Sequence, residues 1–270
     1  MKIAVLIPSR GAPRRLQAVV QAYHELRSGE NDTVYCVVCD KDDPDTARAC
    51  NELADAGMSW FICEGVGNLN SRLNAAARSI NADIVTIASD DNFPLAWHWD
   101  RIIQQCAEEF DAFSWEEKIE PTNCTYPVLT RKWIQAVGRV FPEYFPFWFA
   151  DTWIREVYHL AHGQPINIVI GLPMAGWRGA TRGMRELGFW FQFFASTRIE
   201  RVAEAQRVAG RELTKEHLAP ILDNMAEWDR LQHARVPQFE RAFKAETGVP
   251  SARYVAAKEV ALQWYKDNGR

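Results

Sequence analysis

The feature that most constrains this chain is a series of three short apolar runs, each of which ends at polar or charged residues. The runs cover residues 3–7, 34–39 and 84–88, and segments with the apolar spacing of amphipathic helices separate them. Strands that are apolar along their whole length are buried on both faces, as in a parallel sheet with helices on each side. We therefore predict an α/β fold in which a mostly parallel sheet is flanked by helices.

Polar residues stand directly after each apolar run. In chain order they are Pro8, Ser9 and Arg10, then Asp40 with Asp42 and Asp43, then Ser89, Asp90, Asp91 and Asn92. In an open α/β sheet, ligands bind beyond the carboxyl ends of the strands. We therefore expect the residues that follow the three runs to meet in one binding site.

The adjacent carboxylates Asp90 and Asp91 are the most informative part of this expected site. Two carboxylates at the tip of a buried strand repel each other and lose hydration unless a positive charge offsets them. Mg²⁺ and Mn²⁺ prefer hard oxygen ligands, and Mg²⁺ typically takes one or two carboxylates together with substrate phosphates. The pair is a candidate Mn²⁺ or Mg²⁺ site. The alternative is a turn or helix cap before Phe93 and Pro94, where Asp and Asn are also favoured.

The composition argues against several other classes of protein. The 270 residues carry a formal net charge of -4, without the basic excess of proteins that bind nucleic acid through its phosphates. No apolar stretch reaches the length of a membrane span, and the N-terminus opens on a strand pattern rather than a signal sequence. We expect a cytoplasmic protein with no integral membrane association.

The 6 cysteines are interpreted as reduced thiols of the core. Cys36 and Cys39 have CxxC spacing, but they lie in an apolar run that we predict to be a strand. Residues three apart on a strand point to opposite faces, which argues against a redox or zinc site at this pair.

The second half of the chain has a different pattern. Residues 141–149 are rich in aromatic side chains, and from residue 182 the sequence is mostly helical. We predict two parts, a ligand-binding and catalytic domain over residues 1–180 and a helical extension over residues 181–270. The aromatic residues of 141–149, and Trp177 with Arg178, are expected mainly in the core, with a ligand-stacking platform as the alternative.

The extension carries four arginines at helical spacing. We interpret them as a solvated face, because glutamates alternate with them, and a site for an anionic polymer is the alternative. They are Arg198, Arg201, Arg207 and Arg211.

Four segments of the first half resemble family 2 type GT-A glycosyltransferases, in the order and at the spacing of that family. Residues 3–10 resemble its opening strand, and the acidic loop that begins at Asp40 resembles its segment for the base and ribose. Residues 70–76 look like its ARNxG helix. Residues 87–92 fall where the family has its DxD motif, with Ser89 in place of the usual first Asp.

A fifth segment, residues 149–154, is similar to the ED motif of the family, whose Asp is the catalytic base of inverting members. Asp151 is therefore the candidate base, with a helix N-cap as the alternative role, and Ala150 replaces the usual acid before it. Some GT-A enzymes take a metal ligand from a late histidine, for which His162 is the candidate. A packed or exposed histidine is the ordinary interpretation of that residue.

The resemblance implies a set of contacts to a nucleotide sugar and a metal ion. The contacts to the nucleotide sugar would come from Pro8, Ser9, Arg10, Asp40, Arg72, Asn74, Ser89 and Asp90, and the ligands of Mn²⁺ or Mg²⁺ would be Asp91 with Asp90. For Arg72 and Asn74, hydrogen bonds to loops are the alternative role.

The activity that the resemblance implies is transfer of a sugar from a nucleoside diphosphate sugar, with UDP favoured, to a hydroxyl acceptor with inversion. The acceptor stays open: a sugar, a lipid-linked molecule, a protein or a modified nucleic acid would all present a hydroxyl. One alternative is a sugar nucleotidyltransferase, although such enzymes usually have a glycine-rich loop after the first strand, where this chain has only Gly11. The other alternative is a binding module that has lost catalysis, which the departures at Ser89 and Ala150 keep open.

Overall fold

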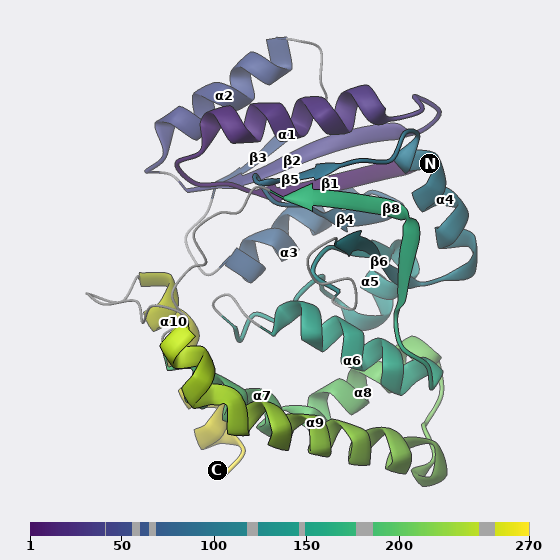
Figure 1. The fold of residues 1–270 in the computed structure, drawn as a ribbon, viewed down its shortest axis with the longest axis vertical. Coiled ribbons are helices and arrows are strands. Elements are labelled where there is room, and N and C mark those ends of the chain that lie inside the picture. The colour runs from purple at the N-terminus through teal and green to yellow at the C-terminus, as the bar shows by residue number, and fades with distance from the viewer. Residues whose placement is uncertain are drawn as a thin grey trace.

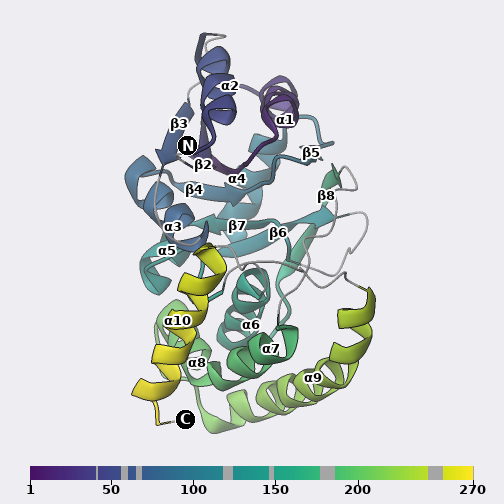
Figure 2. The same cartoon turned by 90° about the vertical axis from the view of Figure 1, so that its left-hand side faces the viewer.

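The computed structural model describes residues 1–40, 42–55, 60–64, 69–117, 124–145, 149–176, 186–242 and 252–269. They form one sheet with helices on both faces and a group of helices that follows the last strand (Figure 1 and Figure 2). The strands are β1 (Lys2–Pro8), β2 (Asp32–Cys39), β3 (Trp60–Glu64), β4 (Ile84–Ile87), β5 (Asn92–Pro94), β6 (Ala112–Glu117), β7 (Pro127–Thr130) and β8 (Asn167–Gly176). The helices are α1 (Pro13–Leu26), α2 (Pro44–Asp55), α3 (Leu69–Ile80), α4 (Trp99–Glu109), α5 (Arg131–Val137), α6 (Ala150–His162), α7 (Leu187–Ser196), α8 (Arg198–Ala209), α9 (Lys215–Ala242) and α10 (Ala252–Asp267).

The three apolar runs form the neighbouring strands β2, β1 and β4 in a sheet of order β3-β2-β1-β4-β7-β6-β8-β5. β1 pairs in parallel with β2 and β4, and β2 pairs in parallel with β3. β7 pairs antiparallel with both β4 and β6, so the second half of the sheet is mixed. The predicted α/β class, with its parallel strands and flanking helices, is confirmed.

Burial on both faces explains why these strands show no alternation of polar and apolar residues. In β1, Ile3 and Val5 pack into the core on the side of α1 and α4, whereas Ala4 and Leu6 pack into the core on the side of α3 and α6. All four side chains are fully buried. The two cysteines of the CxxC sequence follow the same rule, because they lie in these two different cores. Five cysteines have described side chains, and each is a free thiol: Cys36, Cys39, Cys50, Cys106 and Cys124.

Helices α6 to α10 share the core that covers the α3 side of the sheet. Its centre is aromatic: Phe145 is fully buried and contacts the rings of Phe149, Trp153 and Phe193. The aromatic residues of 141–149 that the structure describes are therefore largely core. The predicted boundary near residue 180, and Trp177 with Arg178, lie outside the described residues. Among the described helices, none combines the length and the apolar composition needed to cross a bilayer.

One expectation for the extension was wrong. Arg201 does not lie on a solvated face but is 0% exposed, and its Nε lies 2.7 Å from Oε2 of the buried Glu156. Its guanidinium also packs over the ring of Phe194, with 3.9 Å from the guanidinium carbon to the ring centroid. Helical spacing correctly indicates which residues share a face, but it does not say which neighbouring helix covers that face.

Candidate functional site

The carboxyl ends of β1, β2 and β4 meet at one edge of the sheet, as predicted. The Ser9 N–H donates to the Val38 carbonyl at 3.1 Å, and the Ala88 N–H donates to the Leu6 carbonyl at 2.9 Å, so backbone bonds hold the three strand ends together. Beyond them the Ser9 hydroxyl donates to Asp90 Oδ2 at 2.8 Å. Residues 81 positions apart in sequence thus contact each other directly.

Asp40 is held at this edge by two arginines. The buried Arg72 of α3 places Nη1 2.7 Å from Asp40 Oδ1 and 2.8 Å from the Cys39 carbonyl, while Arg10 binds the other carboxylate oxygen. Arg10 also lies 3.0 Å from Asp42, and about half of its side chain is exposed. Arg72 therefore fixes the position of the Asp40 carboxylate, and Arg10 places a cation at the surface of the site.

Asp43, the last acid of the same loop, connects two parts of the edge. Its carboxylate accepts hydrogen bonds from the Thr46 hydroxyl at 2.6 Å and from the Gly11 N–H at 2.7 Å. Burial disfavours ionisation, but these bonds outweigh it, and the pKa of Asp43 is lowered. Asp43 thereby ties the start of α2 to the loop after β1.

The Ser89–Asp91 segment forms a turn between β4 and β5. The Ser89 hydroxyl donates to Asp91 Oδ1, and Arg15 Nη2 lies 3.9 Å from Asp90 Oδ1. Among the described residues, no group of three or more His, Cys, Asp or Glu side chains is arranged to hold a metal. Two carboxylates and a hydroxyl do fit Mg²⁺ or Mn²⁺ when substrate phosphates complete the coordination, because these ions take hard oxygen ligands.

Asn74 lies apart from this cluster and holds a loop. Its amide oxygen accepts the N–H groups of Val140 at 2.9 Å and Phe141 at 3.0 Å, and its amide nitrogen donates to the Phe141 carbonyl at 2.8 Å and to Glu143 at 3.0 Å. The residue is 1% exposed. The structure thus shows Asn74 in the loop-binding role that was its alternative.

Asp151 lies in the first turn of α6, but it is not the N-cap. That position belongs to Phe149, which has φ 72° and makes no side-chain cap. The Asp151 carboxylate accepts the Thr152 N–H at 2.8 Å. Burial raises the pKa of Asp151, and the bond from Thr152 and the charge of Arg155 offset this only in part. A carboxyl with a raised pKa at the start of a helix is suited to accept a proton.

His162 lies in the last turn of α6 and packs on Tyr158, with 4.4 Å between the ring centroids. Burial lowers the pKa of His162. It is separated from Asp151 by about 16 Å along the helix axis, from the rise of 1.5 Å per residue. The packed histidine is therefore the role that the structure supports.

No protein-family model matches this chain, and no curated protein sequence matches it. Solved structures are similar over much of its length. One is the mannosyltransferase PcManGT from Pyrobaculum calidifontis in complex with GDP-Man and Mn²⁺, with 16% identity, TM-score 0.57 and coverage of 98% of this chain and 81% of that chain. Another is S. aureus TarS in complex with UDP-GlcNAc, with 12% identity, TM-score 0.65 and coverage of 97% and 81%. A third is glucosyl-3-phosphoglycerate synthase from Mycobacterium tuberculosis with Mg²⁺ and UDP, with 13% identity, TM-score 0.52 and coverage of 79% and 80%.

These similarities confirm the predicted GT-A-like fold of the chain. We call the side chains that meet at the carboxyl edge of the sheet the strand-end cluster: Ser9, Arg10, Arg15, Asp40, Asp43, Arg72, Asp90 and Asp91. Among them, Arg15 was not predicted from the sequence. A signal for it was present: Arg14 and Arg15 follow Pro13 in the first turn of α1, which has no acidic residue. Cations are unfavourable beside the positive end of a helix dipole, so their presence there indicates a nearby anion, which Asp90 supplies.

Proposed function

We propose that this chain is a glycosyltransferase that moves a hexose or a related sugar from a nucleoside diphosphate sugar to a hydroxyl acceptor. The observation that carries the proposal is the convergence of Ser9, the Asp40–Arg72 pair and the Ser89–Asp91 turn at the carboxyl edge of a GT-A-like sheet. The similar structures add support, because they contain GDP-Man, UDP-GlcNAc or UDP. A uridine donor is favoured, since two of these three hold a uridine nucleotide.

The donor nucleotide would bind over the strand ends. Asp40 accepts hydrogen bonds from hydroxyl or N–H groups, and its position is fixed by the buried Arg72. Arg10 and Arg15 each have a partly exposed side chain, and a guanidinium can bind phosphate oxygens with pairs of N–H groups.

Asp91 and Asp90 would hold Mn²⁺ or Mg²⁺ against the diphosphate, with Asp90 oriented by the hydrogen bond from Ser9. When bound, such an ion stabilises the negative charge that develops on the leaving diphosphate. The complexes of two similar proteins with Mn²⁺ or Mg²⁺ support this assignment.

Asp151 would act as the base of a single displacement. Its ionised carboxylate removes the proton of the acceptor hydroxyl while the acceptor oxygen forms a bond to the anomeric carbon. The bond from that carbon to the diphosphate oxygen breaks in the same step, and the diphosphate leaves with the electron pair. Attack from the side opposite to the leaving group inverts the anomeric centre. The acceptor itself stays open among sugars, lipid-linked molecules, proteins and modified nucleic acids.

The test is thermal unfolding of the native protein and of Asp91→Ala with UDP, GDP and their sugars, each with and without Mn²⁺. A ligand that binds only the folded state stabilises it, by about 2.7 kcal/mol at a hundred times its Kd. We expect a uridine nucleotide to raise the melting temperature only with metal, and Asp91→Ala to abolish this rise. Asp45→Ala is the matched control, because this exposed acid pairs only with Arg48 in the contacts described.

The outcomes separate the proposal from its alternatives. Absence of any nucleotide effect on the native protein would remove the donor site and with it the proposed activity. Nucleotide-dependent stabilisation without release of UDP from any donor, in the presence of a panel of acceptors or of water, would favour the binding module. Formation of a sugar nucleotide from a nucleoside triphosphate and a sugar phosphate would favour nucleotidyl transfer.

A further inference from the structure

Two polar contacts between buried side chains join α6 to α8. Trp153 Nε1 donates to Glu204 Oε2 at 2.6 Å, and Arg201 Nε lies 2.7 Å from Glu156 Oε2. The two residues from each helix are three positions apart, so they lie on the same face of that helix. The earlier residue of α6 binds the later residue of α8, which requires the two helices to run antiparallel. These two contacts form what we call the α6–α8 clamp.

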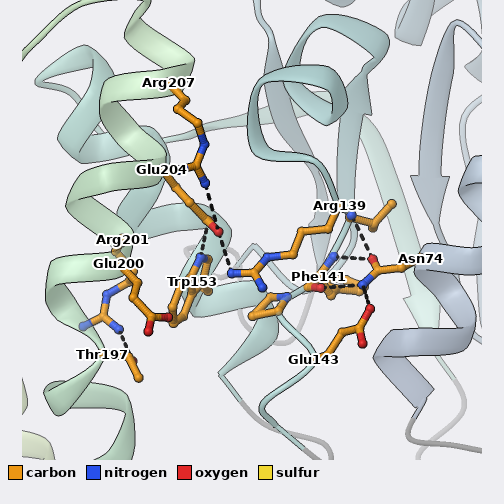
Figure 3. A network of polar contacts seen from close by, with 12 residues as sticks. Asn74, Arg139, Phe141, Glu143, Trp153, Thr197, Glu200, Arg201, Glu204 and Arg207 are labelled. Carbon is orange, nitrogen blue, oxygen red and sulfur yellow. Dashed lines mark hydrogen bonds and ion pairs between the residues drawn. The ribbon is translucent and has the colours of Figure 1, made fainter. Parts of the chain in front are cut away.

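Glu204 also connects the clamp to the first part of the chain. Arg139 Nη2 lies 2.5 Å from Glu204 Oε1, and Arg139 directly precedes the loop residues that Asn74 holds from α3 (Figure 3). Asn74 stands two residues after Arg72, the partner of Asp40. The strand-end cluster is therefore connected to Glu204 and α6 through the backbone of α3, which carries both Arg72 and Asn74, and through the 139–141 loop.

Breaking the α6–α8 clamp would leave buried polar and charged groups without partners. The free-energy cost of this favours one arrangement of the two helices. All four residues of the clamp are at most 5% exposed. Burial raises the pKa of Glu156 and lowers that of Arg201, so each charge depends on its partner. A buried pair of this kind adds little net stability but disfavours every arrangement that leaves one member unpaired. A shift of α6 along α8 by one turn would break both contacts at once.

We propose that the α6–α8 clamp positions Asp151 for catalysis and that Glu204 is the positioning residue that connects it to the strand-end cluster. Asp151 lies two residues before Trp153 on the same helix, so a displacement of the helix backbone at Trp153 also displaces the Asp151 carboxylate. Glu204 acts through the helix rather than by contact, because residues two apart point about 200° from each other around the axis. A misplacement of about 1 Å can cost on the order of a hundredfold in rate. This inference rests on the proposed function.

A cavity beside the clamp makes the proposal testable by chemical rescue. Its volume is about 280 Å³, and Arg139, Arg207 and Glu204 are among the residues that line it. In Glu204→Ala the cavity would be larger and both arginines would have lost their common carboxylate. Acetate matches the missing group in charge and size, and it can accept the Trp153 N–H and the Arg139 N–H in its place.

The experiment compares the native protein, Glu204→Ala and Glu200→Gln in donor turnover with saturating acceptor or water. Glu200 is the matched control: it lies one turn earlier on α8 and lines the same cavity, but it binds Trp264 of α10. For Glu204→Ala we expect kcat to fall by about tenfold or more while the KM for the donor changes by less than about twofold. We expect acetate to recover at least a third of the lost kcat in this variant and to leave the other two proteins unchanged.

A purely structural role predicts a different result. Unchanged kcat in a folded Glu204→Ala protein, or a loss that acetate does not restore, would overturn the inference and leave the proposed function intact. If Glu204→Ala does not fold, Trp153→Phe serves instead: it removes the hydrogen bond to Glu204 and keeps an aromatic ring, so its kcat must fall while the KM for the donor changes by less than about twofold. Unchanged kcat in this variant would also overturn the inference. The proposed function itself fails only if the native protein does not turn over any donor.

Discussion

Asp43 at the strand ends and the carboxylates of α6 differ in what determines their pKa. At the strand ends, hydrogen bonds from Thr46 and Gly11 outweigh burial and lower the pKa of Asp43. Around α6, burial dominates and raises the pKa of both Asp151 and Glu156, in spite of nearby arginines. At the strand ends the surroundings of Asp43 thus favour its ionised form, whereas around α6 burial makes ionisation of Asp151 and Glu156 costly.

This difference corresponds to what each region has to do in the proposed reaction. A site that binds a diphosphate and a metal needs permanent charges that a ligand can reach, and Arg10 is about half exposed there. A base needs a carboxylate that gains from taking up a proton, and such a group is produced by burial. The two regions should therefore respond differently to substitution, and three predictions test this.

The largest expected effect is on the chemistry of Asp151. We expect Asp151→Asn to lower kcat by about 10³-fold, because the amide cannot accept the proton of the acceptor hydroxyl. Binding of the donor nucleotide, measured as the rise in melting temperature with UDP and Mn²⁺, should stay the same. The exposed Asp223→Asn on α9 is the control. Loss of nucleotide binding in Asp151→Asn would show that the two regions are not separable.

The next largest effect concerns the buried ion pair. Arg201→Met should lower the free energy of unfolding by about 3 kcal/mol, because it leaves Glu156 buried without its partner. The double variant Glu156→Met with Arg201→Met should recover most of this loss, since two apolar side chains need no partner. Both values come from urea unfolding at pH 7.

The control for this prediction is the exposed pair of Glu227 and Arg230, which lie 2.6 Å apart on α9. Arg230→Met should leave stability nearly unchanged, because exposed ion pairs are screened by solvent. If Arg201→Met behaves like Arg230→Met, the clamp does not have the energetic character that we assign to it.

The smallest effect is the dependence of the Asp151 region on pH. Because burial raises the pKa of Asp151, kcat should fall on acidification at a higher pH than an ordinary aspartate would give. The folded protein also binds this proton more tightly than the unfolded chain does. The resulting stability is complete below the unfolded pKa and is lost as the pH rises through the folded pKa. Asp151→Asn should therefore melt at a higher temperature than the native protein at pH 7 and at the same temperature at acidic pH. A lower melting temperature at pH 7 would contradict this.

The strand-end cluster could be predicted almost residue by residue. Ser9, Asp40 and Asp90 each follow a strand that is recognisable from its own apolar run, and parallel strands bring their carboxyl ends to one edge. Arg72 was also expected there, from its place in a motif, although its contact is with Asp40. Asn74 stands two residues further on the same helix and yet holds a loop from a distant part of the chain. The sequence of α3 does not indicate where that loop passes.

The sequence by itself determined the parallel sheet, its ligand edge and the two-sided core, because these depend on runs of adjacent residues and on their order in the chain. Only the tertiary structure decided that Arg201 is buried against Glu156 and that Glu204 accepts hydrogen bonds from Trp153 and Arg139. The same holds for the burial that raises the pKa of Asp151. The physical reason is that burial and pairing of a charge depend on which helix covers it. The covering helix is set by the packing of segments about 45 to 65 residues apart, and the local sequence of neither segment indicates it.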